Sequence, residues 1–189
     1  HGVAVVLGPG VNIKRSPLCG RNFEYYSEDP LVAGEMAAAM VEGIQSEGVG
    51  ASLKHFACNN KETNRKDCDS RLSERALREI YLKGFELCVK KAQPLTVMSS
   101  YNLVNGLWAS QNRELLTGIL RGEWGFKGMV TTDWYTHAPQ YTEIAAGNDV
   151  KMGCGDPAHV LQMMREGRLK REDVVVSVRR LLEMILKLA

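Results

Sequence analysis

The chain has 189 residues, 44% of them hydrophobic and 24% charged, which is the composition of a globular domain with a substantial core. Its 24 basic and 22 acidic side chains are mixed along the sequence. This balance gives no support to a nucleic-acid partner or an anionic membrane surface. Glu35 and Glu42 interrupt the uncharged segment around residues 31–41, well before the roughly 20 apolar residues of a membrane span. We therefore expect no membrane partner.

The five cysteines are odd in number and contain no C-x-x-C spacing, which argues against a disulfide framework or a zinc ribbon. We expect reduced thiols, which slightly favour the cytoplasm, and a local bridge between Cys58 and Cys68 stays open. A metal cluster of His55 with these cysteines and Asp69 lacks a regular ligand spacing and is not expected. The chain starts at His1 and enters an apolar run at once. The start therefore looks truncated, and secretion is not excluded.

Strand and helix patterns alternate through the first half of the chain. The predicted elements are a strand over 3–7, a helix over 30–45, a strand over 52–57 and an amphipathic helix that Ser73 caps and Pro94 stops. Asp29 is placed as an N-cap with Pro30 at the first helical position. Gly48 and Gly50 follow that helix and end it.

The same alternation continues in the second half. The predicted elements are a strand over 95–101, a helix capped by Asn112, a strand over 128–133, a short helix near 141–146, a strand over 148–152, a helix over 156–166 and an amphipathic C-terminal helix. Trp108 and Trp124 are interpreted as packing residues.

Strands that are apolar on both faces and joined by helices imply a parallel sheet covered by helices. An open doubly wound sheet and a (β/α)8 barrel both fit this pattern. The five β-α units in 189 residues fall short of a barrel's eight in roughly 250. Either the sheet is open or three strands are missing.

Three consecutive strand ends carry polar chemistry. Lys54 and His55 lie at the end of one strand, Tyr101 at the end of the next and Asp133 at the end of the third. Because the carboxyl ends of parallel strands meet at one rim of a sheet, we expect these side chains to converge on one site.

Longer motifs surround these strand ends and carry a family resemblance. They are Gly20-Arg-Asn-Phe-Glu-Tyr-Tyr-Ser-Glu-Asp-Pro30, Lys54-His-Phe-Ala-Cys-Asn-Asn-Lys-Glu-Thr-Asn-Arg65, Ser73-Glu-Arg-Ala-Leu-Arg-Glu-Ile-Tyr81, Met98-Ser-Ser-Tyr-Asn102 and Thr132-Asp-Trp134. In this order they resemble the catalytic barrel of glycoside hydrolase family 3 over nearly the whole chain. The loop after the Lys-His-Phe motif reads Ala57-Cys-Asn-Asn60, where the hexosaminidase branch carries a histidine acid/base. The resemblance is therefore to the β-glucosidase branch.

The resemblance implies an α/β fold in which residues 1–189 form an incomplete (β/α)8 TIM-like barrel. About five β-α units, roughly strands 3 to 7 with C-terminal helices, would then belong to the N-terminal catalytic domain, with the acid/base domain absent. Thr131 and Thr132 stand where the family commonly has a Met-Ser pair, a mild departure. The chemistry of the family needs no metal and no organic cofactor.

Individual site residues follow from the resemblance. Asp133 matches the nucleophile and Trp134 the aromatic residue that stacks on the sugar. The other positions that line the sugar pocket are Arg21, Lys54, His55, Arg65, Met98 and Tyr101. Lysine and arginine donate hydrogen bonds that orient a sugar's hydroxyl groups, and an indole offers an apolar face to a pyranose.

The implied activity is that of a retaining, exo-acting β-glycosidase that hydrolyses terminal β-linked sugars through a covalent glycosyl-aspartate intermediate. Two alternatives stay open. The chain is a non-catalytic sugar-binding or structural fragment, or Lys54 is the Schiff-base residue of an aldolase-type barrel. Besides a glycoside or small oligosaccharide substrate, we expect as partner a complementary segment that supplies the remaining strands and an acid/base glutamate.

Overall fold

The computed structural model describes residues 2–188. Its main sheet has parallel strands in the order β1, β2, β4, β7, which is also their order along the chain. They are β1 (Val5–Val6), β2 (Gly50–Phe56), β4 (Thr96–Ser99) and β7 (Met129–Thr132). A doubly wound sheet reverses its strand order at a switch point, and this sheet does not. It is a sector of a (β/α)8 barrel, so the predicted incomplete barrel is confirmed.

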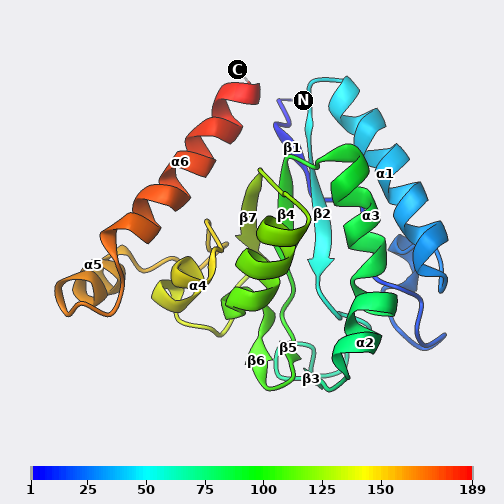
Figure 1. Cartoon of the computed structure of the whole chain (residues 1–189), viewed down its shortest axis with the longest axis horizontal. Coiled ribbons are helices and arrows are strands. Elements are labelled where there is room, and N and C mark those ends of the chain that lie inside the picture. The colour runs from blue at the N-terminus through cyan, green and yellow to red at the C-terminus, as the bar shows by residue number, and fades with distance from the viewer. Residues whose placement is uncertain (1, 189) are drawn as a thin grey trace.

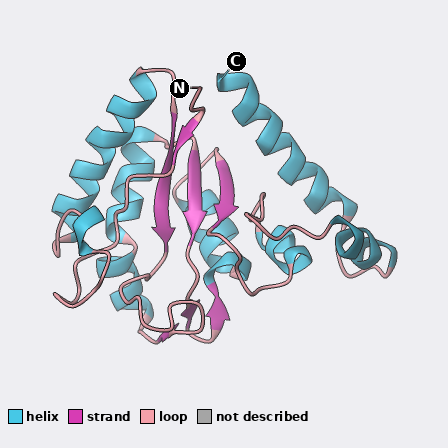
Figure 2. Cartoon of the chain, turned by 180° about the vertical axis from the view of Figure 1, so that it is seen from behind, coloured by secondary structure: helices cyan, strands magenta, loops and turns pink. Residues whose placement is uncertain are grey.

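Helices cover one face of this sheet (Figure 1). They are α1 (Pro30–Ser46), the consecutive segments α2 (Glu74–Ala76), η2 (Leu77–Tyr81) and α3 (Lys83–Ala92), and η4 (Glu114–Glu123). Their predicted N-caps are present: Asp29 Oδ1 accepts from the backbone N–H of Leu31 at 2.7 Å, and Ser73 Oγ accepts from that of Ala76 at 3.2 Å. Figure 2 shows the opposite face of the sheet, across which no helix of residues 2–188 runs. In a closed barrel, this face lines the interior.

The C-terminal part adds a second group of helices beside the sheet. They are α4 (Gln140–Ala146), α5 (Pro157–Arg165) and α6 (Arg171–Leu188), with a small core of Ile144, Val160, Met163 and Leu169. Asp149 ties this group to the sheet, because its carboxylate accepts from the backbone N–H of Val130 in β7 at 2.8 Å and from Arg180 of α6 at 3.0 Å. It also bonds Arg121 of η4 at 2.8 Å.

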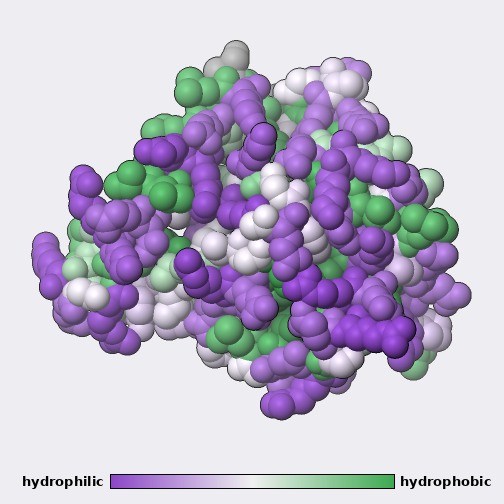
Figure 3. Space-filling view, viewed as in Figure 1, coloured by the Kyte–Doolittle hydropathy of each residue, from purple (hydrophilic) through white to green (hydrophobic). Residues whose placement is uncertain are grey.

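Much of the predicted apolar stripe of α6 lies at the surface (Figure 3). Val178, Leu182 and Ile185 are 49%, 53% and 48% exposed, which is unusual for large apolar side chains on one helix face. None of the helices within residues 2–188 is long and apolar enough to cross a membrane.

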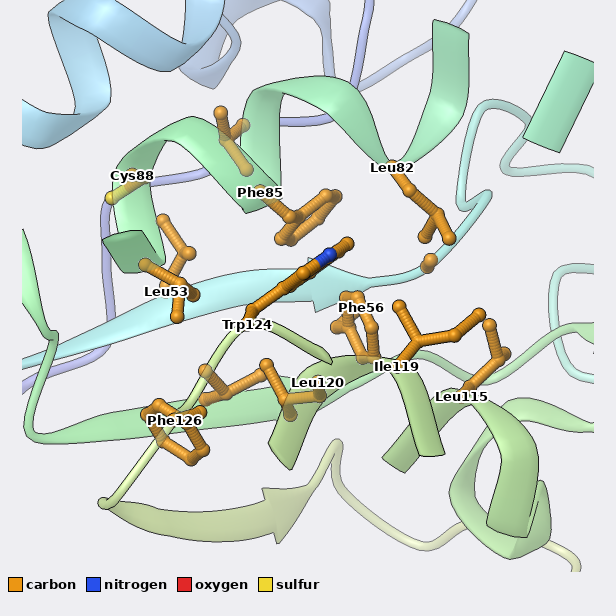
Figure 4. Packing of buried hydrophobic residues seen from close by; sticks show 14 of the residues in the cluster. Leu53, Phe56, Leu82, Phe85, Cys88, Leu115, Ile119, Leu120, Trp124 and Phe126 are labelled. Carbon is orange, nitrogen blue, oxygen red and sulfur yellow. The ribbon is translucent and has the colours of Figure 1, made fainter. Parts of the chain in front are cut away.

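Aromatic side chains fill the space between the sheet and the covering helices (Figure 4). The ring centroid of Phe56, at the end of β2, lies 5.2 Å from that of Phe85 of α3 and 5.8 Å from that of Trp124. Both pairs meet edge to face. This geometry is the one that aromatic pairs favour. Trp124 is a core residue as predicted, and Trp108 donates its indole N–H to the carbonyl of Lys66 at 3.1 Å. The core therefore anchors β2 directly beyond its Lys54-His55 pair.

The structure corrects two predicted strands. The strand over 148–152 is reduced to a single bridge between Val150 and Thr131, and the first strand covers only Val5–Val6 of the predicted 3–7. The physical reason for the first difference is Asp149, whose side-chain oxygen accepts from the backbone N–H of Val130 at 2.8 Å. A side chain there takes the place of a backbone partner in the ladder.

A small second sheet was not foreseen. It consists of β3 (Asp69–Ser70), β5 (Leu103–Val104) and β6 (Leu107–Trp108). Asn105 and Gly106 both have positive φ, 51° and 89°, as a two-residue type I′ hairpin turn requires. An Asn-Gly pair between apolar residues is the strongest short hairpin signal in a sequence.

Candidate active site

A pocket of about 450 Å³ lies at the carboxyl ends of the parallel strands. It is lined by Leu7, Arg21, Lys54, His55, Arg65, Met98, Tyr101, Asp133 and Trp134. All eight residues that the sequence nominated line this pocket, together with Leu7, which sequence reasoning missed. The convergence of β2, β4 and β7 on one rim brings together residues more than a hundred positions apart.

Asp133 follows β7 and is 6% exposed. Its backbone N–H donates to the carbonyl of Ser99 at 3.0 Å, which extends the pairing of β7 with β4 by one residue. Its Oδ1 accepts from the backbone N–H of Trp134 at 2.8 Å, whereas its buried Oδ2 has no hydrogen-bond partner among the described residues. A buried carboxylate oxygen without a donor is rare. The bond to Oδ1 therefore fixes the orientation of the carboxylate, and Oδ2 keeps its capacity to accept a hydrogen bond or to react.

His55 stands next to this free oxygen. Its Nε2 lies 3.8 Å from Asp133 Oδ2, and its side chain is almost fully buried. Burial, with the nearby cations Arg21, Lys54 and Arg65, lowers the pKa of His55 to about 2, so the ring is neutral at ordinary pH.

The backbone at His55 is held by a residue that sequence reasoning missed. Asn12 donates through Nδ2 to the His55 carbonyl at 2.9 Å and accepts the His55 N–H through Oδ1 at 2.8 Å. A side-chain amide carries both an N–H₂ donor group and a carbonyl acceptor, so it can complete both bonds at once. Nothing in the local pattern around Asn12 announced this contact, because it spans 43 positions of sequence.

Glu24 organises the cationic wall of the pocket. Its carboxylate bonds Arg21 and lies 3.0 Å from Lys54 Nζ. Burial raises the pKa of Glu24, but the hydrogen bonds from Arg21 and Lys54 outweigh burial and hold that pKa below its usual range. The i,i+3 spacing of Arg21 and Glu24 within one motif was a signal for this pair. A lysine held in a close ion pair is not free to attack a carbonyl, so the contact of Glu24 with Lys54 argues against a Schiff-base role for that lysine.

Arg65 and Tyr101 form a second unit of the wall. The Arg65 guanidinium lies over the Tyr101 ring at 4.6 Å from its centroid, within the range of a cation–π contact. Arg65 also pairs with Glu62 at 3.1 Å. Burial and the nearby Asp133 carboxylate raise the pKa of Tyr101 to about 12, so its hydroxyl remains a donor.

Met98 and Trp134 occupy opposite positions in the pocket. Met98, in β4, is 2% exposed and contributes apolar surface at the base, whereas Trp134 is 44% exposed and stands at the rim. The Trp134 and Tyr135 rings are 6.1 Å apart. A Cβ on Gly153 would approach both rings to 2.8 and 3.0 Å, so the rings rest directly on the Gly153 backbone.

A buried ion pair fixes the loop that follows Asp133. Lys151 Nζ bonds Glu143 at 2.9 Å, the carbonyl of Thr136 at 3.1 Å and that of Ala138 at 2.7 Å. Burial raises the pKa of Glu143 although the hydrogen bonds from Lys151 and Thr136 oppose that shift. Sequence reasoning missed both members of this pair.

The five cysteines are free thiols, so the local Cys58–Cys68 bridge that stayed open is not formed. Within residues 2–188, no three His, Cys, Asp or Glu side chains are grouped as metal ligands.

A barrel sector whose strand ends gather a carboxylate, cations and an exposed tryptophan is typical of barrel enzymes that act on sugars. The family description "Glycosyl hydrolase family 3 N terminal domain" matches residues 1–184. The chain therefore belongs to glycoside hydrolase family 3, as its motifs indicated.

The chain is similar to relatives named as a β-glucosidase and as an arabinopyranosidase. β-Glucosidase A of Butyrivibrio fibrisolvens is 59% identical over 89% of this chain and 20% of the relative. Exo-α-(1→6)-L-arabinopyranosidase of Bifidobacterium breve is 53% identical over 88% of this chain and 22% of that protein. The chain thus spans about a fifth of the length of these curated relatives.

A solved structure agrees with the fold. β-Glucosidase 3B of Thermotoga neapolitana, in complex with α-D-glucose, superposes with a TM-score of 0.95 at 49% identity, over 98% of this chain and 27% of that one.

Proposed function

We propose that the protein carrying this chain is a retaining, exo-acting β-glycosidase of the β-glucosidase type, with Asp133 as its nucleophile. The observation that carries the proposal is the Asp133 carboxylate, in which Oδ1 is held by the Trp134 N–H and Oδ2 has no hydrogen-bond partner within residues 2–188. A nucleophilic oxygen must be fixed in place and must keep a lone pair open toward the sugar.

The reaction is a double displacement. Asp133 Oδ2 attacks the anomeric carbon while the bond to the leaving oxygen breaks and a second carboxyl group protonates that oxygen. Water, deprotonated by the same second carboxyl group, then attacks the anomeric carbon and releases Asp133. Arg21, Lys54 and Arg65 supply hydrogen-bond donors for the sugar hydroxyls, and Trp134 offers its face at the rim.

The second carboxyl group is proposed to come from outside these residues. Among the described residues that line the pocket, Asp133 is the one carboxylate, and a retaining enzyme needs its partner roughly 5 to 5.5 Å away. A complementary segment would carry this glutamate and the remaining strands. We propose that this segment binds at the β1 edge, where Val6 and Leu7 are 40% and 42% exposed, and at the apolar face of α6.

A second candidate function rests on the same observation. With a single carboxylate in the pocket, the chain by itself would bind a sugar without turning it over. Glucose binding without any covalent adduct would support this candidate over a catalytic fragment.

Trapping of the covalent intermediate tests the proposal. The chain, alone and with any polypeptide that copurifies with it, is incubated with activated 2-deoxy-2-fluoro donors of glucose and of arabinopyranose, followed by intact mass and peptide mapping. We expect an adduct on Asp133. Asp133→Asn should abolish the adduct, whereas Asp67→Asn, the same change at a carboxylate that pairs with His137 at the surface, should leave it intact. An adduct on another residue would overturn the assignment of the nucleophile.

A further inference from the structure

Tyr25 lies behind the pocket, on the far side of His55 from Asp133. It is 3% exposed and follows the short helical turn η1 (Asn22–Glu24). Its hydroxyl oxygen is 3.2 Å from His55 Nδ1, and the two rings meet edge to face with centroids 6.3 Å apart. A line of polar atoms therefore runs from Tyr25 through the imidazole to the free oxygen of Asp133.

Gly10 makes this position of Tyr25 possible. A Cβ on Gly10 would approach ring carbons Cδ1 and Cε1 of Tyr25 to 2.9 Å, closer than such atoms normally come. The tyrosine ring thus rests on bare backbone next to β2, where Gly10 bridges to Lys54. Close contact on one side and the imidazole on the other leave the phenol little freedom.

The charge of Asp133 decides where the imidazole proton resides. A neutral histidine has one donor nitrogen and one acceptor nitrogen. His55 Nε2 faces the Asp133 carboxylate at 3.8 Å, and a carboxylate only accepts. A lone pair on Nε2 would face that negative charge, whereas an N–H is attracted to it. Nε2 is therefore the donor, and Nδ1 is left to accept from the Tyr25 hydroxyl.

The polar groups beyond Tyr25 favour the same donor and acceptor roles, in which the phenol donates to His55 Nδ1. Asn59 Nδ2 lies 3.5 Å from the Tyr25 oxygen and can donate to it while the phenol donates to His55. The reversed arrangement would send the phenol proton to the Asn59 carbonyl at 3.4 Å, a longer contact than the 3.2 Å to His55. It would also leave the bare His55 Nε2 facing Asp133 Oδ2, two acceptors with no proton between them. The reversed arrangement is therefore the poorer one.

Three cations surround the ring and keep it neutral. Arg21, Lys54 and Arg65 all disfavour an imidazolium at His55, and burial acts in the same sense. The imidazole is therefore neutral and carries one proton, which can reside on either Nδ1 or Nε2.

We propose that Tyr25 is a positioning residue, which holds His55 in the neutral tautomer with its proton on Nε2 and so directs an N–H donor at Asp133 Oδ2 and at a ligand oxygen bound beside it. Tyr25 acts through His55 and does not itself line the pocket. The tautomer is a property of the chain as it stands. Only its consequence for turnover rests on the proposed function.

Nitrogen NMR on the 15N-labelled chain at neutral pH tests this directly, because proton-bearing and bare imidazole nitrogens have widely separated chemical shifts. We expect His55 Nε2 at the position of a proton-bearing nitrogen and Nδ1 at that of a bare nitrogen shifted by an accepted hydrogen bond. A proton on Nδ1, or an imidazolium, would overturn the inference. This outcome is independent of whether a fluoro-sugar traps Asp133.

Variants sharpen the test. Tyr25→Phe removes only the hydroxyl, and we expect the Nδ1 resonance to move to that of a nitrogen without a hydrogen bond or toward exchange between tautomers. Gly10→Ala, which displaces the ring, should change Nδ1 in the same way. Tyr26→Phe is the matched control, since Tyr26 packs against the core, and it should leave both nitrogens unchanged. An unchanged Nδ1 in Tyr25→Phe would overturn the role of Tyr25 even if the wild-type tautomer is as expected.

Discussion

The two walls of the pocket are built in opposite ways. On the wall formed by β2 and the Arg21 segment, Glu24 joins Arg21 to Lys54 and Asn12 closes both backbone bonds of His55. On the β7 wall, Asp133 keeps one buried oxygen that has no partner in the described part of the chain. The completed contacts at Glu24 and Asn12 fix geometry, and the incomplete one at Asp133 keeps capacity for a ligand. Positioning and chemistry are therefore assigned to different strands of the same sheet.

Removing the reactive side of this comparison should have the largest effect. In the protein that carries the chain, Asp133→Ala deletes the proposed nucleophile, and we expect hydrolysis of an activated aryl β-glycoside to fall on the order of 10³-fold or more. Added azide should restore turnover by occupying the vacated position and should give the glycosyl azide of inverted anomeric configuration. Residual activity near that of the wild type would contradict the role of Asp133.

Breaking the cationic wall should have the next largest effect. Glu24→Gln keeps the shape of the side chain but removes the charge that holds Arg21 and Lys54. We expect KM for the glycoside to rise about tenfold with a much smaller change in kcat, since charge-assisted contacts to a bound sugar are weakened. Glu79→Gln is the control, because Glu79 belongs to an exposed pair with Arg75, and it should change neither constant. A loss confined to kcat would place Glu24 in the chemistry instead.

The same wall should also make stability sensitive to acid. The folded-state pKa of Glu24 lies below its ordinary value of 4.5, so its contribution to stability is fully present above about pH 4.5 and is lost as pH falls through the folded pKa. Glu143 has a raised pKa and acts in the opposite sense. Thermal unfolding of the wild type should lose more Tm between neutral pH and pH 4 than Glu24→Gln loses, by about 2–4 °C. Equal losses in both proteins would show that Glu24 does not carry the acid sensitivity.

The parts of the molecule that followed from sequence are those governed by local patterns. Asp29 and Ser73 cap helices where they were expected to, because a cap is read from a few neighbouring residues. Lys54, His55, Tyr101 and Asp133 could be nominated because they lie at strand ends, which a parallel sheet brings together. The family resemblance supplied the other four: Arg21, Arg65, Met98 and Trp134.

The parts that did not follow depend on contacts between distant segments. Asn12 and Lys151 have no motif of their own, and their roles arise from partners that only the fold supplies. Val150 lost its predicted strand for a similar reason, since Asp149 bonds the neighbouring strand through its side chain. Apolar alternation predicts burial but not whether a side chain will replace the backbone in a ladder.

The smallest effect is expected at the rim, where the two walls meet solvent through Trp134. Gly153→Ala would press a methyl group against the Trp134 and Tyr135 rings, and its φ of +79° adds backbone strain. Gly167→Ala is the matched control, since Gly167 has φ +71° but open space around it. Both variants should lose about 1 kcal/mol of stability through strain. Only Gly153→Ala should also shift the tryptophan fluorescence and lower kcat/KM, by roughly two- to fivefold, if the rings bind the substrate as stacked surfaces. Identical behaviour of the two variants would mean that the rings do not rest on Gly153 in solution.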